Sequence, residues 1–195
     1  HSIIGIVEKR EKRAIDKTAE KSGTQNFELS IIGSAIFNDD ILVGYLNGND
    51  TKSVNFVTDN IKSGLITFPT PINGAEVKTS PTPPAGSGLD NISDNQGLSS
   101  VIIIKSKTRN DIELLDGNII LKTKIKLRGS LGELVGNIDI SEQENISKME
   151  EACSKAIEEG ITLAVKKVQK QFQLDIFGFS SVFHRKYPEE WRKIK

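Results

Sequence analysis

The sequence has little of several residue types on which small functional sites depend. It contains one Cys and two His among 195 residues, so it can form no intrachain disulfide and offers few metal ligands. No apolar run approaches the roughly 20 residues of a membrane-spanning helix. Lys+Arg and Asp+Glu both number 26, which gives a net charge of zero. This balance argues against a dedicated nucleic-acid binder and against a polybasic membrane-surface protein, because both usually carry excess cations.

The common catalytic and nucleotide-binding motifs are missing. The chain has no G-x-x-x-x-G-K-[ST], G-x-G-x-x-G, G-x-S-x-G, C-x-x-C or H-E-x-x-H pattern. His184, with Glu189 or Glu190, is the one candidate acid–base or metal group, and a polar helix end explains it better. Cys153 lies within a helical pattern and is predicted to be a small core residue. We therefore expect no enzyme, no metal and no cofactor, with a hydrolase as the least favoured alternative.

The first third of the chain predicts a hairpin, a helix and a strand. Residues 1–26 form an N-terminal arm, or the remnant of a preceding domain, with a short strand over residues 3–7. Residues 27–37 and 41–46 are strands joined by the Asn and Asp residues of a turn. A short helix over residues 52–61 follows, capped within Asn49-Asp50-Thr51. A strand over residues 65–68 then ends at Pro69.

A low-complexity stretch interrupts the chain between residues 69 and 97. It holds five of the six prolines together with many Gly, Ser and Thr residues, and it has almost no large apolar side chain. Such a composition cannot bury enough surface to offset ordering entropy of roughly 1–2 kcal/mol per residue. We expect a mobile surface insertion within a domain that spans residues 27–195, and we expect limited proteolysis to cut there first.

Two long strands and a long helix follow. Strands over residues 100–115 and from residue 118 onward are joined by Asp116-Gly117, the strongest hairpin signal in the chain. The second strand alternates apolar residues with a basic row that consists of Lys122, Lys124, Lys126 and Arg128. A solvated outer face explains this row, with binding to anionic headgroups or nucleic acid as the alternative. Without interleaved aromatic residues, single-strand nucleic-acid binding is disfavoured.

The long helix is predicted from Ser141 to Gln171, with Ser141 and Glu144 as a capping box. An apolar stripe of period 3.6 predicts that Ile157, Ile161 and Val165 are buried against the sheet. The fold class is then α+β: a mainly antiparallel sheet with a long C-terminal helix and short helices packed on one face.

Aromatic residues gather near the C-terminus, where two short helices are expected over residues 176–185 and from Pro188. We expect Asp175 to cap the first of these helices and Gly178 to allow close backbone approach. The motif is either a folding element, with Phe177, Phe179 and Trp191 as anchors, or a docking surface. The candidate residues for either role are Asp175, Phe177, Gly178, Phe179, His184, Tyr187, Pro188 and Trp191.

The same segment carries a family resemblance. Residues 174–179 (LDIFGF) and 183–191 (FHRKYPEEW) closely resemble the C-terminal signature of the Ger(x)C family, the C subunits of nutrient germinant receptors in spore-forming bacteria. Shorter similarities lie at residues 136–139 (GNID), 104–108 (IKSKT) and in the first predicted hairpin. The family usually has Gly where this chain has Ser180. The resemblance covers residues 27–195, and the Pro-rich insertion is the poorest match.

The resemblance implies a non-catalytic C-terminal piece of a lipoprotein on the outer face of the spore inner membrane. In that family an N-terminal lipidated Cys anchors the subunit, and neither this Cys nor a signal peptide is present in the 195 residues, so we expect this piece to be soluble. The implied partners are the membrane-embedded A and B subunits of the receptor, with no nucleic acid. The alternative function is a small-molecule module that binds the germinant itself, for which an aromatic pocket with converging polar groups would be the sign.

Overall fold

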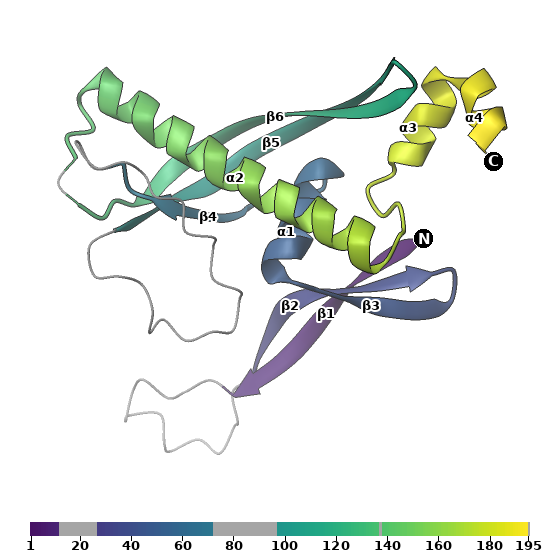
Figure 1. Ribbon diagram of the computed structural model, residues 1–195. Helices are drawn as coiled ribbons and strands as arrows, with labels where there is room; N and C mark the ends of the chain where they lie inside the picture. Colours follow the sequence, from purple (N-terminus) through teal and green to yellow (C-terminus); the bar gives the residue numbers. More distant parts are fainter. Residues whose placement is uncertain (12–26, 72–96, 137, 195) are drawn as a thin grey trace.

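The computed structural model describes residues 1–11, 27–71, 97–136 and 138–194. The fold is α+β, as predicted, but its strands lie in two antiparallel three-stranded sheets rather than in one. Figure 1 shows the long helix lying across the molecule, with one sheet on either side of a short helix. The elements are β1 Ser2–Glu11, β2 Phe27–Asn38, β3 Ile41–Asn47, α1 Gly48–Val57, β4 Gly64–Pro69, β5 Leu98–Leu115, β6 Asn118–Glu133, α2 Gln143–Gln171, α3 Phe179–Lys186 and α4 Pro188–Ile194.

The N-terminal sheet has the order β1-β2-β3. Ile36 of β2 lies opposite Ile3 on one side and Gly44 on the other, and its side chain is fully buried. Because side chains alternate along a strand, the face that carries this row is packed against α1, α2 and the residues before α3. β1 pairs with β2 over its whole length, while the domain boundary drawn at residue 27 stays a prediction.

The second sheet has the order β4-β5-β6 and contains the longest hairpin. The predicted turn at Asp116-Gly117 is confirmed, and both residues have positive φ values of 50° and 77°, which a two-residue hairpin turn requires. The register shifts twice along this pair, once beside Gly129. One shift leaves Gly132 of β6 without a partner residue and the other leaves Ile104 of β5, so both are β-bulges.

Helix α1 begins and ends earlier than predicted. Its N-cap is Asn47, whose Oδ1 accepts a hydrogen bond from the backbone N–H of Asp50 at 2.8 Å. The helix ends at Val57 because Asp59 adopts a left-handed φ of 60°. There the carboxylate of Asp59 accepts the backbone N–H of Thr108 at 2.7 Å, which fixes the end of α1 against the middle of β5.

Helix α2 ends at Gln171 as predicted, but its predicted capping box is wrong. The hydroxyl of Ser141 donates to Asp139 at 2.7 Å, and the helix starts at Gln143 with no side-chain cap. At Gly160 the helix lies close to α1, because a Cβ there would lie 3.3 Å from the hydroxyl of Ser53.

The buried residues of α2 also differ from the prediction. Its buried side chains are Met149, Cys153, Ala164 and Val168, and Cys153 is a core residue as expected. Ile157, Ile161 and Val165 are only partly buried, although they pack against the two apolar clusters of the protein. The physical reason is that α2 rests on α1 and on the short strand β4, whereas a groove separates its first half from β5 and β6.

The Pro-rich insertion falls almost entirely on residues 72–96, which lie outside the described residues. At its base the backbone N–H of Thr70 donates to the carbonyl of Gly97 at 2.9 Å. The hydroxyl of Thr70 also lies 2.7 Å from that of Ser99. The two ends of the insertion are thus held together at the start of β5.

Candidate functional site

The C-terminal motif begins with Asp175, whose side chain caps a helix that starts four residues later. Asp175 Oδ1 accepts the backbone N–H of Phe179 at 3.1 Å, and its Oδ2 accepts that of Ser180 at 2.5 Å. Asp175 therefore does satisfy free N–H groups of the next helix, as predicted. The predicted start of that helix at Ile176 is wrong, since α3 begins at Phe179 and the carboxylate reaches it across the intervening residues 176–178.

Gly178 occupies the N-cap position of α3 with a φ of 78°. This is the left-handed region, which glycine adopts without the steric cost that a Cβ brings. The close backbone approach expected here is not present, because a Cβ on Gly178 would meet no atom within 4 Å. The glycine is thus required by the turn that directs α3, and it is not required by packing.

The aromatic residues of the motif join two parts of the molecule. Phe177 is buried in the cluster that includes Ile36, Val57 and Val168, so it attaches the motif to α1, α2 and the N-terminal sheet. Its ring stacks on that of Phe179 with centroids 5.6 Å apart. This burial is what the folding interpretation of the motif expects of Phe177, and its role as an anchor stays a prediction.

Helices α3 and α4 are held together by a second aromatic group. Phe183 is buried, and its ring lies 5.6 Å from that of Tyr187 and 6.2 Å, edge to face, from that of Trp191. Pro188 is the first residue of α4, as predicted, and the carbonyl of Tyr187 accepts the backbone N–H of Trp191. Trp191 itself is only partly buried, so one side of its ring packs while the other stays accessible.

His184 does not form part of a catalytic arrangement in the described residues. Its side chain is exposed, and its ring lies 5.5 Å from that of Trp191. Glu189, one of its two proposed partners, instead accepts a hydrogen bond from Arg192 at 2.8 Å. The described residues also contain no group of three or more His, Cys, Asp or Glu side chains that could hold a metal ion.

One ion pair fastens α3 to the second sheet. Lys186 Nζ donates to Asp111 of β5 at 2.6 Å. The hydrogen bond from Lys186 lowers the pKa of the Asp111 carboxyl, and the same bond raises the pKa of the lysine. Both groups are exposed, so the pair positions the helix more than it stabilises the fold.

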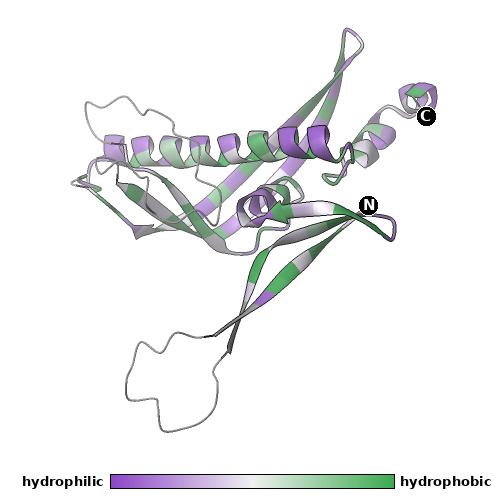
Figure 2. Ribbon diagram, turned by 60° about the horizontal axis from the view of Figure 1, so that its bottom comes forward, coloured by the Kyte–Doolittle hydropathy of each residue, from purple (hydrophilic) through white to green (hydrophobic). Residues whose placement is uncertain are grey.

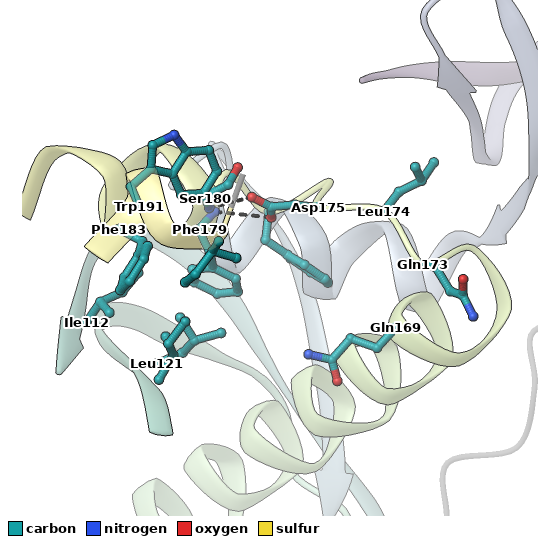
Figure 3. A pocket seen from close by; sticks show the side chains of 13 residues that line it. Ile112, Leu121, Gln169, Gln173, Leu174, Asp175, Phe179, Ser180, Phe183 and Trp191 are labelled. Carbon is teal, nitrogen blue, oxygen red and sulfur yellow. Dashed lines mark hydrogen bonds between the residues drawn. The ribbon is translucent and has the colours of Figure 1, made fainter. Parts of the chain in front are cut away.

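These elements line an open apolar pocket of about 420 Å³ at the motif. Figure 3 shows Ile112, Leu121 and Phe183 together on one side and Gln169 of α2 on the other. Its polar side chains are few, and the carboxylate of Asp175 is already occupied by two backbone N–H groups. The full lining consists of Ile112, Ile119, Leu121, Gln169, Gln173, Leu174, Asp175, Phe177, Phe179, Ser180, Phe183, Trp191 and Ile194.

A larger groove of about 970 Å³ lies between the first half of α2 and strands β5 and β6. Ile125 and Leu127 of β6 line one side, and Met149 and Ile157 of α2 line the other. Cys153 also lines this groove, and burial raises the pKa of its thiol. The thiol is therefore poorly ionised at neutral pH and is a weak nucleophile.

Comparison with known proteins identifies the family. The family described as spore germination B3/GerAC-like, C-terminal, matches residues 32–195. This chain belongs to that family. The resemblance to the Ger(x)C C-terminal domain is thereby confirmed, and the matched range includes both apolar clusters, the pocket and the whole aromatic motif.

Two relatives of this spore germination domain can be compared with it. The chain is 29% identical over 83 residues to spore germination protein KC of Bacillus subtilis (strain 168), which covers 43% of the chain and 20% of that protein. It is also similar to the crystal structure of the GerBC protein, with a TM-score of 0.61 and 21% identity over 86% of the chain and 45% of the GerBC chain. The GerBC likeness shows a shared fold. The chain spans less than half the length of either relative.

Sequence reasoning missed the parts of the site that depend on distant residues. Ile112 and Leu121 of the β5–β6 hairpin line the pocket. The ion pair between Asp111 and Lys186 links β5 to α3. The alternating pattern of the strands placed Leu121 on an apolar face, but it did not indicate which helix would lie opposite. That information comes only from the tertiary packing.

Proposed function

We propose that this chain is the C-terminal domain of the C subunit of a spore germinant receptor and acts there without catalysis. Family membership over residues 32–195 supports the assignment, as does the similarity to a protein named for spore germination. In this proposal the full-length subunit is held on the outer face of the spore inner membrane by an N-terminal lipid. No helix among the described residues is long and apolar enough to cross a membrane.

The proposed mode of action is contact with the membrane-embedded A and B subunits of the receptor. The observation that carries this proposal is the apolar pocket at the aromatic motif, whose rim leaves Ile119, Leu121 and Ile194 exposed. Exposed aliphatic side chains around a buried aromatic residue such as Phe183 are typical of a partner surface. The two interpretations of the motif then apply to different residues. Phe177 and Phe183 stabilise the fold, and the rim of the pocket binds the partner subunits.

The experiment is co-purification of the intact subunit with the A and B subunits. A variant that carries Ile119→Asp and Leu121→Asp places two charges on the rim, and charges buried at an interface are costly without partners. We expect loss of co-purification and of nutrient-triggered germination, with an unchanged melting temperature of the isolated domain.

The matched control is Leu163→Asp, which changes a similarly exposed leucine on the solvent side of α2. This control should co-purify with the A and B subunits, and spores that carry it should germinate normally. Normal co-purification of the rim variant, or equal loss in the control, would contradict the proposal that the pocket is the contact site.

A second candidate function is direct binding of a small germinant, and the same pocket favours it. Its volume of about 420 Å³ lies within the range of ligand sites, roughly 300–1,000 Å³. Its walls combine aromatic rings with the amides of Gln169 and Gln173. Because Trp191 is the single tryptophan and lines the pocket, amino acids and sugars can be titrated against its fluorescence in the intact subunit. A saturable change that is lost in Gln169→Leu would favour this function over subunit contact.

A further inference from the structure

The outer face of the β5–β6 hairpin concentrates positive charge. Its strand pairing places cations directly opposite one another in three successive rows, and all six side chains are exposed. Figure 2 shows the resulting alternation of hydrophilic and hydrophobic bands along both strands. The rows, which we call the cationic face, are Lys105 with Arg128, Lys107 with Lys126, and Arg109 with Lys124. The basic row evident in the sequence supplies three of these residues, and the partner strand supplies the others.

This arrangement costs stability, because like charges directly opposite on neighbouring strands repel. In the part of the chain that the structure describes, only Lys107 of the six forms an ion pair, with Asp59 just beyond the C-terminal end of α1. The carboxylates farther along the same face, Asp111 and Glu113, are engaged by Lys186 and Lys122. The zero net charge of the whole chain therefore conceals a surface on which cations greatly outnumber their partners.

Aliphatic side chains continue the cationic face toward β4. Leu65 pairs with Ile102 across β4 and β5, and their neighbours Ile66 and Ile103 are buried on the α2 side. Since side chains alternate, Leu65 and Ile102 point outward, and both are about half exposed. Ile104 lies at the bulge next to Lys105 and is 53% exposed. The face thus joins three exposed aliphatic residues to six cations.

We propose that the cationic face binds the surface of a bilayer that contains anionic lipid headgroups. Basic side chains are attracted to such a surface, and adjacent aliphatic side chains can enter the boundary between headgroups and acyl chains. Leu65, Ile102 and Ile104 would gain nothing from a nucleic-acid backbone, and the face offers no aromatic rings for base stacking. A symmetric dimer through this face is disfavoured, since it would oppose cations with cations. The face lies apart from the rim of the aromatic pocket, so a domain lying on the membrane keeps that rim available.

The test is sedimentation of the 195-residue chain with phosphatidylcholine vesicles that either contain or lack phosphatidylglycerol. We expect binding only to the anionic vesicles, with strong weakening by salt. Substitution of Lys124, Lys126 and Arg128 by Gln should weaken binding about 100-fold, as the product of roughly fivefold for each basic side chain at an anionic surface. Ile102→Ser should weaken it further, and its effect should persist at high salt.

The matched control removes three exposed cations from α2 by substituting Lys155, Lys166 and Lys170 with Gln, which gives the same net charge. It should bind like the unchanged chain, and circular dichroism should show that both variants remain folded. Equal loss in both variants would overturn the proposal, because net charge alone would then explain binding. Binding to duplex DNA or inorganic polyphosphate without binding to anionic vesicles would overturn it as well. The A and B subunits are absent from this assay, so it can fail independently of the proposed function.

Discussion

The two halves of α2 carry the same apolar stripe but differ in what covers it. In the second half, Ala164 and Val168 are fully buried against α1 and the N-terminal sheet. In the first half, Met149 and Cys153 are buried in the other apolar cluster, but Ile146 and Ile157 remain half-buried beside the groove that separates the helix from β5 and β6. A 3.6-residue period therefore identifies the face of a helix that packs, whereas the neighbouring elements determine how much of that face is buried.

The closed half is held by α1. Ser53 approaches Gly160 near the middle of α2, and Lys167 donates to Asp50 of α1 at 2.5 Å. Both partners of this ion pair are partly buried, so it is less screened than a surface pair. The cluster of the open half also contains Phe56 of α1, but its other buried partners come from the second sheet, chiefly Ile66 and Phe68 of β4.

The largest expected effect comes from the anchor of the closed half. Phe177→Ala removes an almost fully buried ring from the cluster around Val168, and such a truncation typically costs about 3–5 kcal/mol. Chemical denaturation should show this loss of unfolding free energy, with α3 and α4 exchanging amide protons faster than in the unchanged chain. If Phe177→Ala lowered the unfolding free energy by no more than an ordinary surface substitution does, the motif would not be attached to this core.

A pair of enlarging substitutions compares the two halves directly. Ala164→Leu adds volume where the side chain has no space, and overpacking of this kind costs about 1–3 kcal/mol. Ile157→Phe adds volume toward the open groove and should change the unfolding free energy by no more than about 0.5 kcal/mol. Thermal denaturation of both variants tests this difference, and equal destabilisation would mean that the groove is closed in solution.

The Asp175 cap of α3 should contribute less to the unfolding free energy than the buried side chains of the two apolar clusters. Asp175→Ala leaves the backbone N–H groups of Phe179 and Ser180 without their acceptor and should cost about 0.5–2 kcal/mol. Asp175→Asn keeps one acceptor and should cost less than the alanine variant. His184→Ala is the control, because its side chain is exposed, and it should leave the denaturation midpoint nearly unchanged.

The smallest effect is the pH dependence of the link between α3 and β5. The hydrogen bond from Lys186 lowers the pKa of Asp111 in the folded protein. Its stabilising contribution is therefore present above the ordinary carboxyl pKa and is lost as the pH falls through the lowered folded value. An NMR titration of the Asp111 carboxyl should show this lowered pKa, and Lys186→Met should raise it toward the ordinary range. An unchanged titration in that variant would show that the pair does not form.

Local chemistry predicted much of the fold. The Asp116-Gly117 turn, the start of α4 at Pro188 and the end of α2 at Gln171 all follow from residues close in sequence, and all three are confirmed. The errors arose where a different local hydrogen bond formed. Asn47 rather than a later residue caps α1, and the hydroxyl of Ser141 binds Asp139 instead of capping α2.

The division into two sheets and the candidate site were harder to predict, since both depend on contacts between distant residues. Asp175 was correctly expected to cap a helix, but the later start of that helix at Phe179 was not evident in the pattern. The opposing cations of β5 and β6 are separated by many residues in sequence and meet only through the register of the hairpin. Such pairings require the strand alignment, which alternation alone does not specify.

The most direct test of the account is amide hydrogen exchange of the full-length subunit, alone and in complex with the A and B subunits. On complex formation we expect new protection at the rim of the aromatic pocket, over residues 112–121 and in α4. The amides of Ala164 and Val168 in α2 should exchange slowly in both states, because both residues are already buried. Protection that appears elsewhere while the rim remains unchanged would contradict the claim that this domain contacts its partners through the pocket.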